Sequence, residues 1–268
     1  METLQKFLVQ PSKAIVLTIH GAGEHIGRYH HFAEWLNQNQ ISMIGGDLPG
    51  LGRSKERRGH IQHFDDYLKK VDQWLFFAIE QFPNLPIFLF GHSMGGLITL
   101  RYLEEYGKER PLSGVVLTSP AIRIGMEIPR WQLTLARFME KIWPTLRLKS
   151  GIKAEELTHD LKIIKANQID PLVYGKVTIR WFFQFQQAIE EVWKKVDRIK
   201  RLRLPMLYLQ AGEDTLIDPK ASKEFIKQLD PKRVEFHFLP GLYHEVLNEL
   251  EREKYLKMIS DWILNQLK

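Results

Sequence analysis

Short runs of consecutive apolar residues alternate along most of the chain with longer segments in which apolar residues recur every three or four positions. The short runs predict buried strands, and the longer segments predict amphipathic helices. Strands are predicted over residues 4–9, 14–19, 41–46, 85–90, 114–118, 205–210 and 233–238. Helices are predicted from residue 30 onward and over 64–82, 96–103 and 250–267. This alternation is typical of an α/β domain with a mostly parallel central sheet flanked by helices.

The alternation stops between residues 121 and 204, where helical patterns replace the strand–helix units. The helical patterns and an aromatic cluster in this stretch cover residues 129–143, 181–185 and 186–199. We therefore predict a core made of residues 1–120 and 205–268, with residues 121–204 inserted into it as a helical cap.

Composition narrows the class of protein. The chain has 268 residues, of which 44% are hydrophobic and 26% charged, enough for one large core. It contains no cysteine, which excludes a disulfide framework and any Cys-based metal site. Residues 1–6 lack the pattern of a signal peptide, and no apolar stretch approaches the ~20 residues that span a bilayer. These features predict a cytoplasmic protein.

The positive charge is concentrated in one part of the chain. The formal net charge is +6, and residues 120–204 hold 17 Lys and Arg against 9 Asp and Glu. The predicted cap therefore carries the whole basic surplus. No nucleic-acid partner is expected, because the basic segment has no recognisable reader motif.

The clearest chemical motif is Gly-His-Ser-Met-Gly at residues 91–95, between a predicted strand and a predicted helix. This arrangement is typical of the nucleophile elbow of a serine hydrolase. The turn is so tight that side chains two positions before and after the serine would collide, which glycine avoids. Ser93 would then stand at a helix N-terminus, which favours developing negative charge. Taken alone, the pentapeptide also fits a glycine-rich turn without chemistry.

A catalytic base is expected after the serine in sequence, following the acid. Three histidines follow Ser93. His159 falls in the predicted cap, and His237 lies inside a predicted strand, where its side chain cannot reach over the end of the sheet. His244 lies in the loop after the last strand and is therefore the predicted base.

The acid is also found by elimination. Asp218 precedes Pro219 and a helical pattern, so it is interpreted as a helix N-cap. The other aspartates considered belong to a helix-end turn or to the predicted cap: Asp230, Asp160, Asp170 and Asp197. Asp214, four residues past its strand, remains as the predicted partner of His244. Ser93, Asp214 and His244 would then act as a catalytic triad.

A His-Gly-Ala-Gly loop at residues 20–23 follows an early strand, where such enzymes supply half of the oxyanion hole. We predict that the N–H groups of Ala22 and Met94 bind the oxyanion, the alternative being a plain tight turn. A metal site is not expected: there is no HExxH spacing, although histidines gather at His20, His25, His30 and His31.

From residue 20 almost to its end, the chain resembles the monoacylglycerol lipase and lysophospholipase group of α/β-hydrolases. The matching segments are residues 20–25 with Arg28-Tyr29, residues 91–96, and the loops of Asp214 and His244. The resemblance implies an α/β-hydrolase fold with a helical cap, hydrolysis of single-acyl lipid esters, and no cofactor. One departure is Leu51, where relatives usually have histidine, and it bears on the subfamily rather than on the chemistry.

Two alternatives remain open. The chain could be a carboxylesterase, thioesterase or acyltransferase acting on non-lipid acyl substrates, or a non-catalytic ligand-binding module. Aromatic cap residues would line an acyl-chain pocket or simply pack on the body: Trp131, Phe138, Trp181 and Phe182. A lipid substrate also suggests transient, peripheral contact of the basic cap with an anionic membrane surface. The basic residues considered for this contact, which could instead only solvate a helix face, are Lys194, Lys195, Arg198, Lys200, Arg201 and Arg203.

Overall fold

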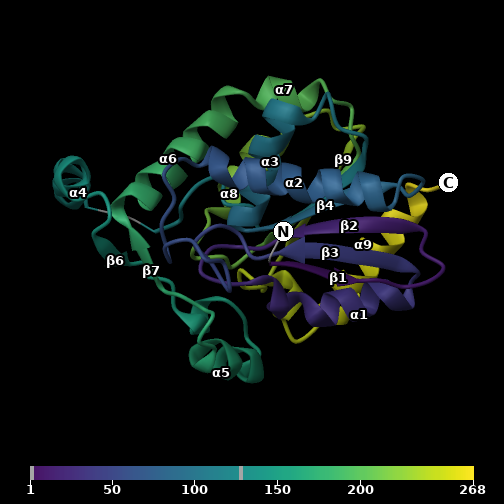
Figure 1. Ribbon diagram of the computed structural model, residues 1–268, viewed down its shortest axis with the longest axis horizontal. Coiled ribbons are helices and arrows are strands. Elements are labelled where there is room, and N and C mark those ends of the chain that lie inside the picture. The colour runs from purple at the N-terminus through teal and green to yellow at the C-terminus, as the bar shows by residue number, and fades with distance from the viewer. Residues whose placement is uncertain (1–2, 127–128) are drawn as a thin grey trace.

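A seven-stranded sheet forms the centre of the computed structural model, which describes residues 3–126 and 129–268 (Figure 1). Its strand order is β1-β3-β2-β4-β5-β8-β9, and all neighbours are parallel except β1 and β3. The strands are β1 (Leu4–Phe7), β2 (Ala14–Ile19), β3 (Ile41–Gly46), β4 (Ile87–His92), β5 (Leu112–Thr118), β8 (Met206–Ala211) and β9 (Val234–Leu239). The mostly parallel sheet predicted from the sequence is confirmed.

Helices cover both faces of this sheet. One face carries α1 (His30–Gln38) and α9 (Arg252–Asn265), with the short 3-10 helices η1 (Ile26–Tyr29) and η3 (Val246–Asn248). The other face carries α2 (Asp65–Gln81), α3 (Met94–Tyr106) and α8 (Pro219–Ile226). Along β2, Ile15 and Leu17 belong to the apolar core under α2 and α3, whereas Ala14 and Val16 belong to the core under α1 and α9. The strand is therefore buried on both sides, which explains why its sequence is continuously apolar.

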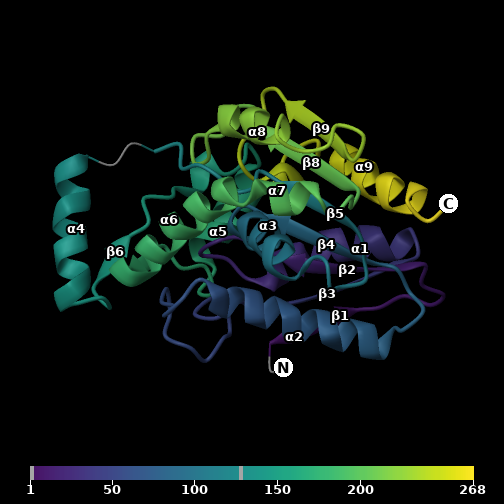
Figure 2. The ribbon, with the colours of Figure 1, turned by 90° about the horizontal axis from the view of Figure 1, so that it is seen from above.

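An insertion lies between β5 and β8. It contains α4 (Arg130–Ile142), β6 (Arg147–Lys149), η2 (Ala154–Glu156), α5 (Leu161–Ile169), β7 (Lys176–Thr178), α6 (Ile179–Lys194) and α7 (Val196–Lys200). The helix expected near 129–143 is α4. The pattern did not predict α5 or the antiparallel β6–β7 pair, because a three-residue strand such as β6, exposed throughout, carries no alternation. Figure 2 shows α4 set apart from the layered body.

The C-terminal part of the insertion is packed firmly on α3. Trp181, Phe185 and Val192 of α6 are buried in the same core as α3. Ion pairs add to this packing: Glu105 of α3 lies 2.9 Å from Lys195 Nζ and 3.1 Å from Arg198 Nη1. Two of the basic residues considered from the sequence for membrane contact, Lys195 and Arg198, are thus paired with an acid of the protein itself. Among the helices of the described residues, none is both long and apolar enough to cross a membrane.

Candidate active site

The strand-to-helix turn after β4 holds Ser93 in an unusual backbone conformation. Its φ is 53° and its ψ −119°, a region that L-residues rarely adopt. The turn needs its glycines, because a Cβ on Gly95 would lie 2.0 Å from the carbonyl oxygen of Ile19, and one on Gly91 would lie 2.6 Å from that of Gly95. Ser93 therefore stands at the N-terminus of α3, as the motif predicts.

Asp214 and His244 meet above the ends of β8 and β9. His244 Nδ1 lies 2.6 Å from Asp214 Oδ2, and both side chains are almost fully buried. The other oxygen, Asp214 Oδ1, accepts hydrogen bonds from the backbone N–H groups of Leu216 and Ile217, each at 3.0 Å. The carboxylate is thus fixed from two sides. The acid and the base found by elimination are brought together.

Two adjacent histidines have pKa values shifted in opposite directions. Burial by itself would lower the pKa of His244, but the charge and hydrogen bond of Asp214 outweigh it and raise that pKa above its usual value. The ring of His92 lies 4.9 Å from that of His244. Burial, with the charge of His244 as a further cause, lowers the pKa of His92 to about 4. Of the two rings, His244 is therefore the one that gains a proton more readily.

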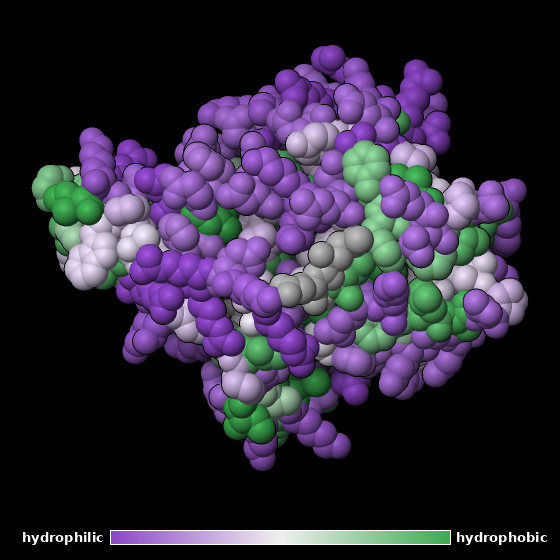
Figure 3. Space-filling view, in the orientation of Figure 1, coloured by the Kyte–Doolittle hydropathy of each residue, from purple (hydrophilic) through white to green (hydrophobic). Residues whose placement is uncertain are grey.

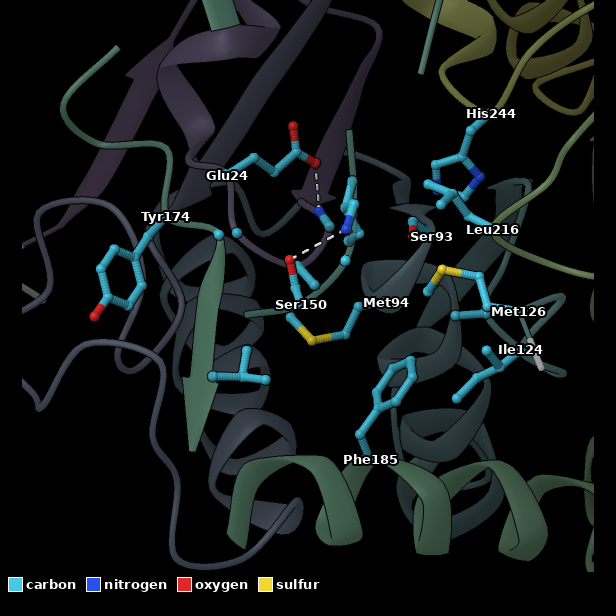
Figure 4. A pocket seen from close by; sticks show the side chains of 18 of the residues that line it. Glu24, Ser93, Met94, Ile124, Met126, Ser150, Tyr174, Phe185, Leu216 and His244 are labelled. Atoms are coloured by element: carbon cyan, nitrogen blue, oxygen red, sulfur yellow. Dashed lines mark hydrogen bonds between the residues drawn. The ribbon is translucent and has the colours of Figure 1, made fainter. Parts of the chain in front are cut away.

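The predicted nucleophile and the predicted base share one pocket. Ser93 and His244 both line it, as Figure 4 shows, although no hydrogen bond joins their side chains. Nδ1 of His244 must carry the hydrogen donated to Asp214, because a carboxylate only accepts, so Nε2 keeps a free lone pair in the neutral ring. Hydrogen bonds of catalytic groups often tighten only when substrate is bound.

The loop after β2 lies directly against Ser93. A Cβ on Gly21 would lie 3.3 Å from Cβ of Ser93, so the backbone approaches the serine as closely as glycine permits. Ala22 of this loop and Met94 of α3 line the same pocket as Ser93. The two predicted oxyanion donors are thus placed on the walls around the nucleophile.

A buried charge network that the sequence reasoning missed connects this loop to the loop of the base. Arg28 donates to Glu24 at 2.7 Å and to Glu245 through two bonds of 2.6 and 2.7 Å. Burial would raise the pKa of both carboxyls, but the Arg28 guanidinium outweighs it and holds both below their usual range. Glu24 also accepts from the N–H of Gly21 and the hydroxyl of Tyr29. The four-residue spacing of Glu24 and Arg28 was the only sequence signal for this network.

The histidines near the start of the chain serve as hydrogen-bonding groups in separate places. His25 contacts Asp170 of the insertion at 2.9 Å, His31 contacts the carbonyl of Leu247, and His20 contacts the N–H of Leu48. Within residues 3–126 and 129–268, no three His, Asp or Glu side chains are grouped to hold a metal ion.

The pocket has a volume of about 450 Å³ and is walled mainly by apolar side chains. This volume lies within the ~300–1,000 Å³ typical of small-molecule sites. Figure 4 places Phe185 at the opposite end of the view from Glu24 and His244. Of the predicted acyl-pocket residues, Trp181 and Phe182 of α6 line it.

Trp131 and Phe138 do not line the pocket, which corrects the prediction made from the sequence. They are 67% and 61% exposed, on the outer face of α4. The helix turns its smaller residues toward the pocket: Gln132, Leu133 and Ala136. These positions lie on the opposite side of the helix from Trp131 and Phe138, because successive side chains are rotated by about 100° around the helix axis.

The doubly covered sheet, the serine at a strand-to-helix turn and the acid–histidine pair define an α/β-hydrolase. A family model described as serine aminopeptidase, S33, matches residues 10–251, and the chain belongs to this family. It is 32% identical to phospholipase YtpA of Bacillus subtilis over 91% of this chain and 92% of that protein. It is 28% identical to a monoacylglycerol lipase of Mycolicibacterium smegmatis over 95% and 89% of the two chains. The crystal structure of Paleococcus ferrophilus monoacylglycerol lipase superimposes with a TM-score of 0.88 at 30% identity, covering 99% and 100%.

Proposed function

We propose that this protein is a serine hydrolase that cleaves the carboxylic esters of single-acyl lipids, a monoacylglycerol or a lysophospholipid. One observation carries the proposal: Ser93 and His244, whose Nδ1 is bonded to Asp214, line a single pocket with largely apolar walls. Similarity to a monoacylglycerol lipase and a phospholipase supports the lipid-ester class. No cofactor is needed for this chemistry.

In the proposed reaction, Ser93 Oγ attacks the ester carbonyl while His244 Nε2 takes its proton. Asp214 keeps the hydrogen on Nδ1 and stabilises the imidazolium that forms. The N–H groups of Ala22 and Met94 bind the oxyanion, with each such donor typically contributing ~10²–10³ in kcat. His244 then protonates the leaving alcohol, and water repeats the cycle on the acyl-enzyme bound to Ser93.

The insertion acts as the cap of this pocket in our proposal, with the core formed by residues 1–120 and 205–268. Apolar residues from several insertion elements face the cavity, among them Leu133, Val177 and Phe185. An acyl chain would lie against these walls. A head group would be released toward solvent after cleavage of the ester.

The substrate class is tested by a panel of p-nitrophenyl esters of rising chain length, monoacylglycerols, diacylglycerols and lysophosphatidylcholine. Each methylene buried in the pocket contributes ~0.8 kcal/mol, so kcat/KM should rise up to about fourfold per methylene until the cavity is full. A single-acyl lipid should be turned over faster than its diacyl counterpart. The highest rate on acetyl esters, thioesters or aminoacyl p-nitroanilides would contradict the lipid-ester assignment.

Peripheral contact with a membrane is a further part of the proposed function. The outer face of α4 and the residue after it expose a continuous apolar stripe: Trp131, Leu135, Phe138, Ile142 and Trp143. The helix also carries basic side chains along one flank of this stripe, Arg130, Arg137 and Lys141. Figure 3 shows hydrophobic surface over α4 at the left edge of the molecule. An exposed apolar stripe with one basic flank suits the surface of an anionic bilayer.

Replacing both Trp131 and Phe138 with glutamate is expected to weaken co-sedimentation with vesicles containing phosphatidylglycerol by at least about tenfold. Each large apolar side chain contributes on the order of 1.5–3 kcal/mol when buried, and 1.4 kcal/mol corresponds to tenfold. Turnover of a soluble short-chain ester should stay unchanged. Leu250→Glu is the matched control, because Leu250 is 69% exposed but lies far along the chain from α4. Binding that is indifferent to lipid charge and to these substitutions would contradict membrane contact.

A further inference from the structure

One segment of the insertion touches both loops of the candidate active site. Residues 157–174, which we call the α5 brace, begin just after η2, include α5 and end two residues before the start of β7. In Figure 1 the brace occupies the lower edge of the molecule, well apart from α4. One end contacts the loop that carries His244, and the other contacts the loop that carries Ala22.

Backbone and hydroxyl groups make the first contacts at the base loop. The N–H of Glu245, the residue after His244, donates to the carbonyl of Leu157 at 2.8 Å. The hydroxyl of Thr158 donates to the carbonyl of Asn248 at 2.7 Å. The segment on the C-terminal side of the base is therefore bonded to the brace at two points.

Glu249 is the centre of a second set of contacts, on the N-terminal side of the base. Its side chain is only 2% exposed, and its Oε1 accepts from the N–H of Tyr243 at 2.8 Å and from His159 Nδ1 at 3.0 Å. Its Oε2 accepts from the N–H of His159 at 3.2 Å. The ring of His159 stacks on Tyr243 with centroids 3.7 Å apart. Tyr243 precedes His244, so the base is flanked on both sides by residues that the brace holds.

The other end of the brace is bonded to the loop after β2. The N–H of Tyr174 donates to the carbonyl of Gly23 at 2.8 Å. His25 Nδ1 accepts from the N–H of Gly27, so its Nε2 carries the hydrogen that bonds to Asp170 at 2.9 Å. The brace thus joins the two loops that must keep a fixed separation while charge moves between the oxyanion and the base.

We infer that Glu249 and His159 are positioning residues for His244, and that the α5 brace belongs to the catalytic framework rather than to a moving lid. The inference rests on the proposed function of Ser93 and His244. Glu249 is a buried carboxylate whose acceptor sites are used by the loop and by the brace together, so removing either set of bonds lets the base loop shift. A displacement of 1 Å at such a site can lower the rate by ~10²-fold.

The test compares four variants on a soluble short-chain ester that needs little of the acyl pocket. His159→Phe keeps the stacking on Tyr243 and the backbone bond to Glu249 but removes the side-chain hydrogen bond to Glu249. His159→Asn restores a side-chain donor near the position of Nδ1. Glu249→Gln removes the charge. Glu105→Gln is the matched control, since Glu105 ties the insertion to α3 through Lys195 and Arg198, away from both loops.

In the wild-type enzyme, kcat/KM should fall on the acid side, because His244 must be neutral to act as the base. The midpoint of this fall should lie above the ordinary histidine pKa of about 6.5, because Asp214 raises the pKa of His244. In His159→Phe and Glu249→Gln, kcat and the rate of fluorophosphonate labelling should fall about 10- to 100-fold while KM stays within about twofold. The acid limb should move down toward the ordinary histidine value as the bond to Asp214 loosens. His159→Asn should recover most of the lost rate.

Equal losses in Glu105→Gln, a rise in KM alone, or a loss of thermal stability without movement of the acid limb would overturn the inference. Any of these results would make the contacts an ordinary anchor of the insertion. His159 is 38% exposed, so its variants should fold even if Glu249→Gln does not. A wild-type protein without ester turnover or labelling would instead reject the proposed function itself.

Discussion

Replacing Ser93 with alanine is expected to lower kcat for ester hydrolysis by at least ~10³-fold and to abolish labelling by a fluorophosphonate. No acyl-enzyme can form without the hydroxyl. Stability should change little, because the side chain of Ser93 forms no hydrogen bond in the part of the chain that the structure describes, and alanine fits the same space. Steady-state kinetics, mass spectrometry of the labelled protein and a thermal melt measure the three quantities.

Ser150→Ala is the matched control for this experiment. Ser150 also lines the pocket, where its hydroxyl accepts a weak bond from the N–H of Ile152 at 3.4 Å. Its loss should leave the stoichiometry of labelling at Ser93 unchanged. Absence of labelling, or labelling of another serine, would favour the alternative of a non-catalytic ligand-binding module on this scaffold. Full activity in Ser93→Ala would instead mean that Ser93 is not the nucleophile.

Asp214→Asn is expected to be nearly as damaging, with a fall in kcat of up to ~10⁴-fold. An asparagine amide donates where a carboxylate accepts, so it favours the wrong tautomer of His244. The charge that stabilises the imidazolium is lost as well. The measurement is kcat for the wild type and the variant across pH.

Asp218→Asn provides the comparison for Asp214. Asp218 caps α8 by accepting from the N–H of Lys220 at 2.9 Å, as the Asp-Pro pattern predicted. Asparagine is a comparably good N-cap, so stability should change by less than ~1 kcal/mol and kcat should stay unchanged. If Asp218→Asn lost activity and Asp214→Asn kept it, the acid would be wrongly assigned.

The sequence predicted the core and the meeting of Asp214 with His244 for the same physical reason. Strands buried on both faces are continuously apolar, so β2, β4 and β8 are visible as short runs without knowledge of their neighbours. Parallel strands end at one edge of the sheet. Residues that follow β4, β8 and β9 must therefore gather at that edge, and elimination among a few loop residues was enough to pair them.

The sequence could not orient α4. Its apolar stripe through Trp131 and Phe138 predicted a buried face, because such stripes usually face a core. The structure turns this stripe outward and places Leu133 and Ala136 toward the pocket. Periodicity defines which residues share a helix face, but what covers that face is decided by tertiary packing.

The contacts between the insertion and the catalytic loops were also beyond the sequence. In α5, Leu161 and Ile169 are 70% and 82% exposed, so this helix has no strong apolar face to detect. It is held by hydrogen bonds and charges at its two ends. Arg28 and Glu245 likewise form an ion pair although 217 positions separate them in the sequence. The local sequence around either residue does not indicate its partner.

Two neighbouring stretches of the insertion are therefore under different constraints during divergence. Residues 129–152 contribute pocket wall through side chains such as Leu133 and Leu148, and they can vary in size without disturbing a bond to either catalytic loop. Residues 157–174 are bonded by backbone and charged groups to both loops. If they position His244 as we infer, substitutions there will also change turnover. Exchanging residues 129–152 with those of a related protein should therefore change the pocket wall without changing the contacts of the two loops. Exchanging the whole insertion should change both.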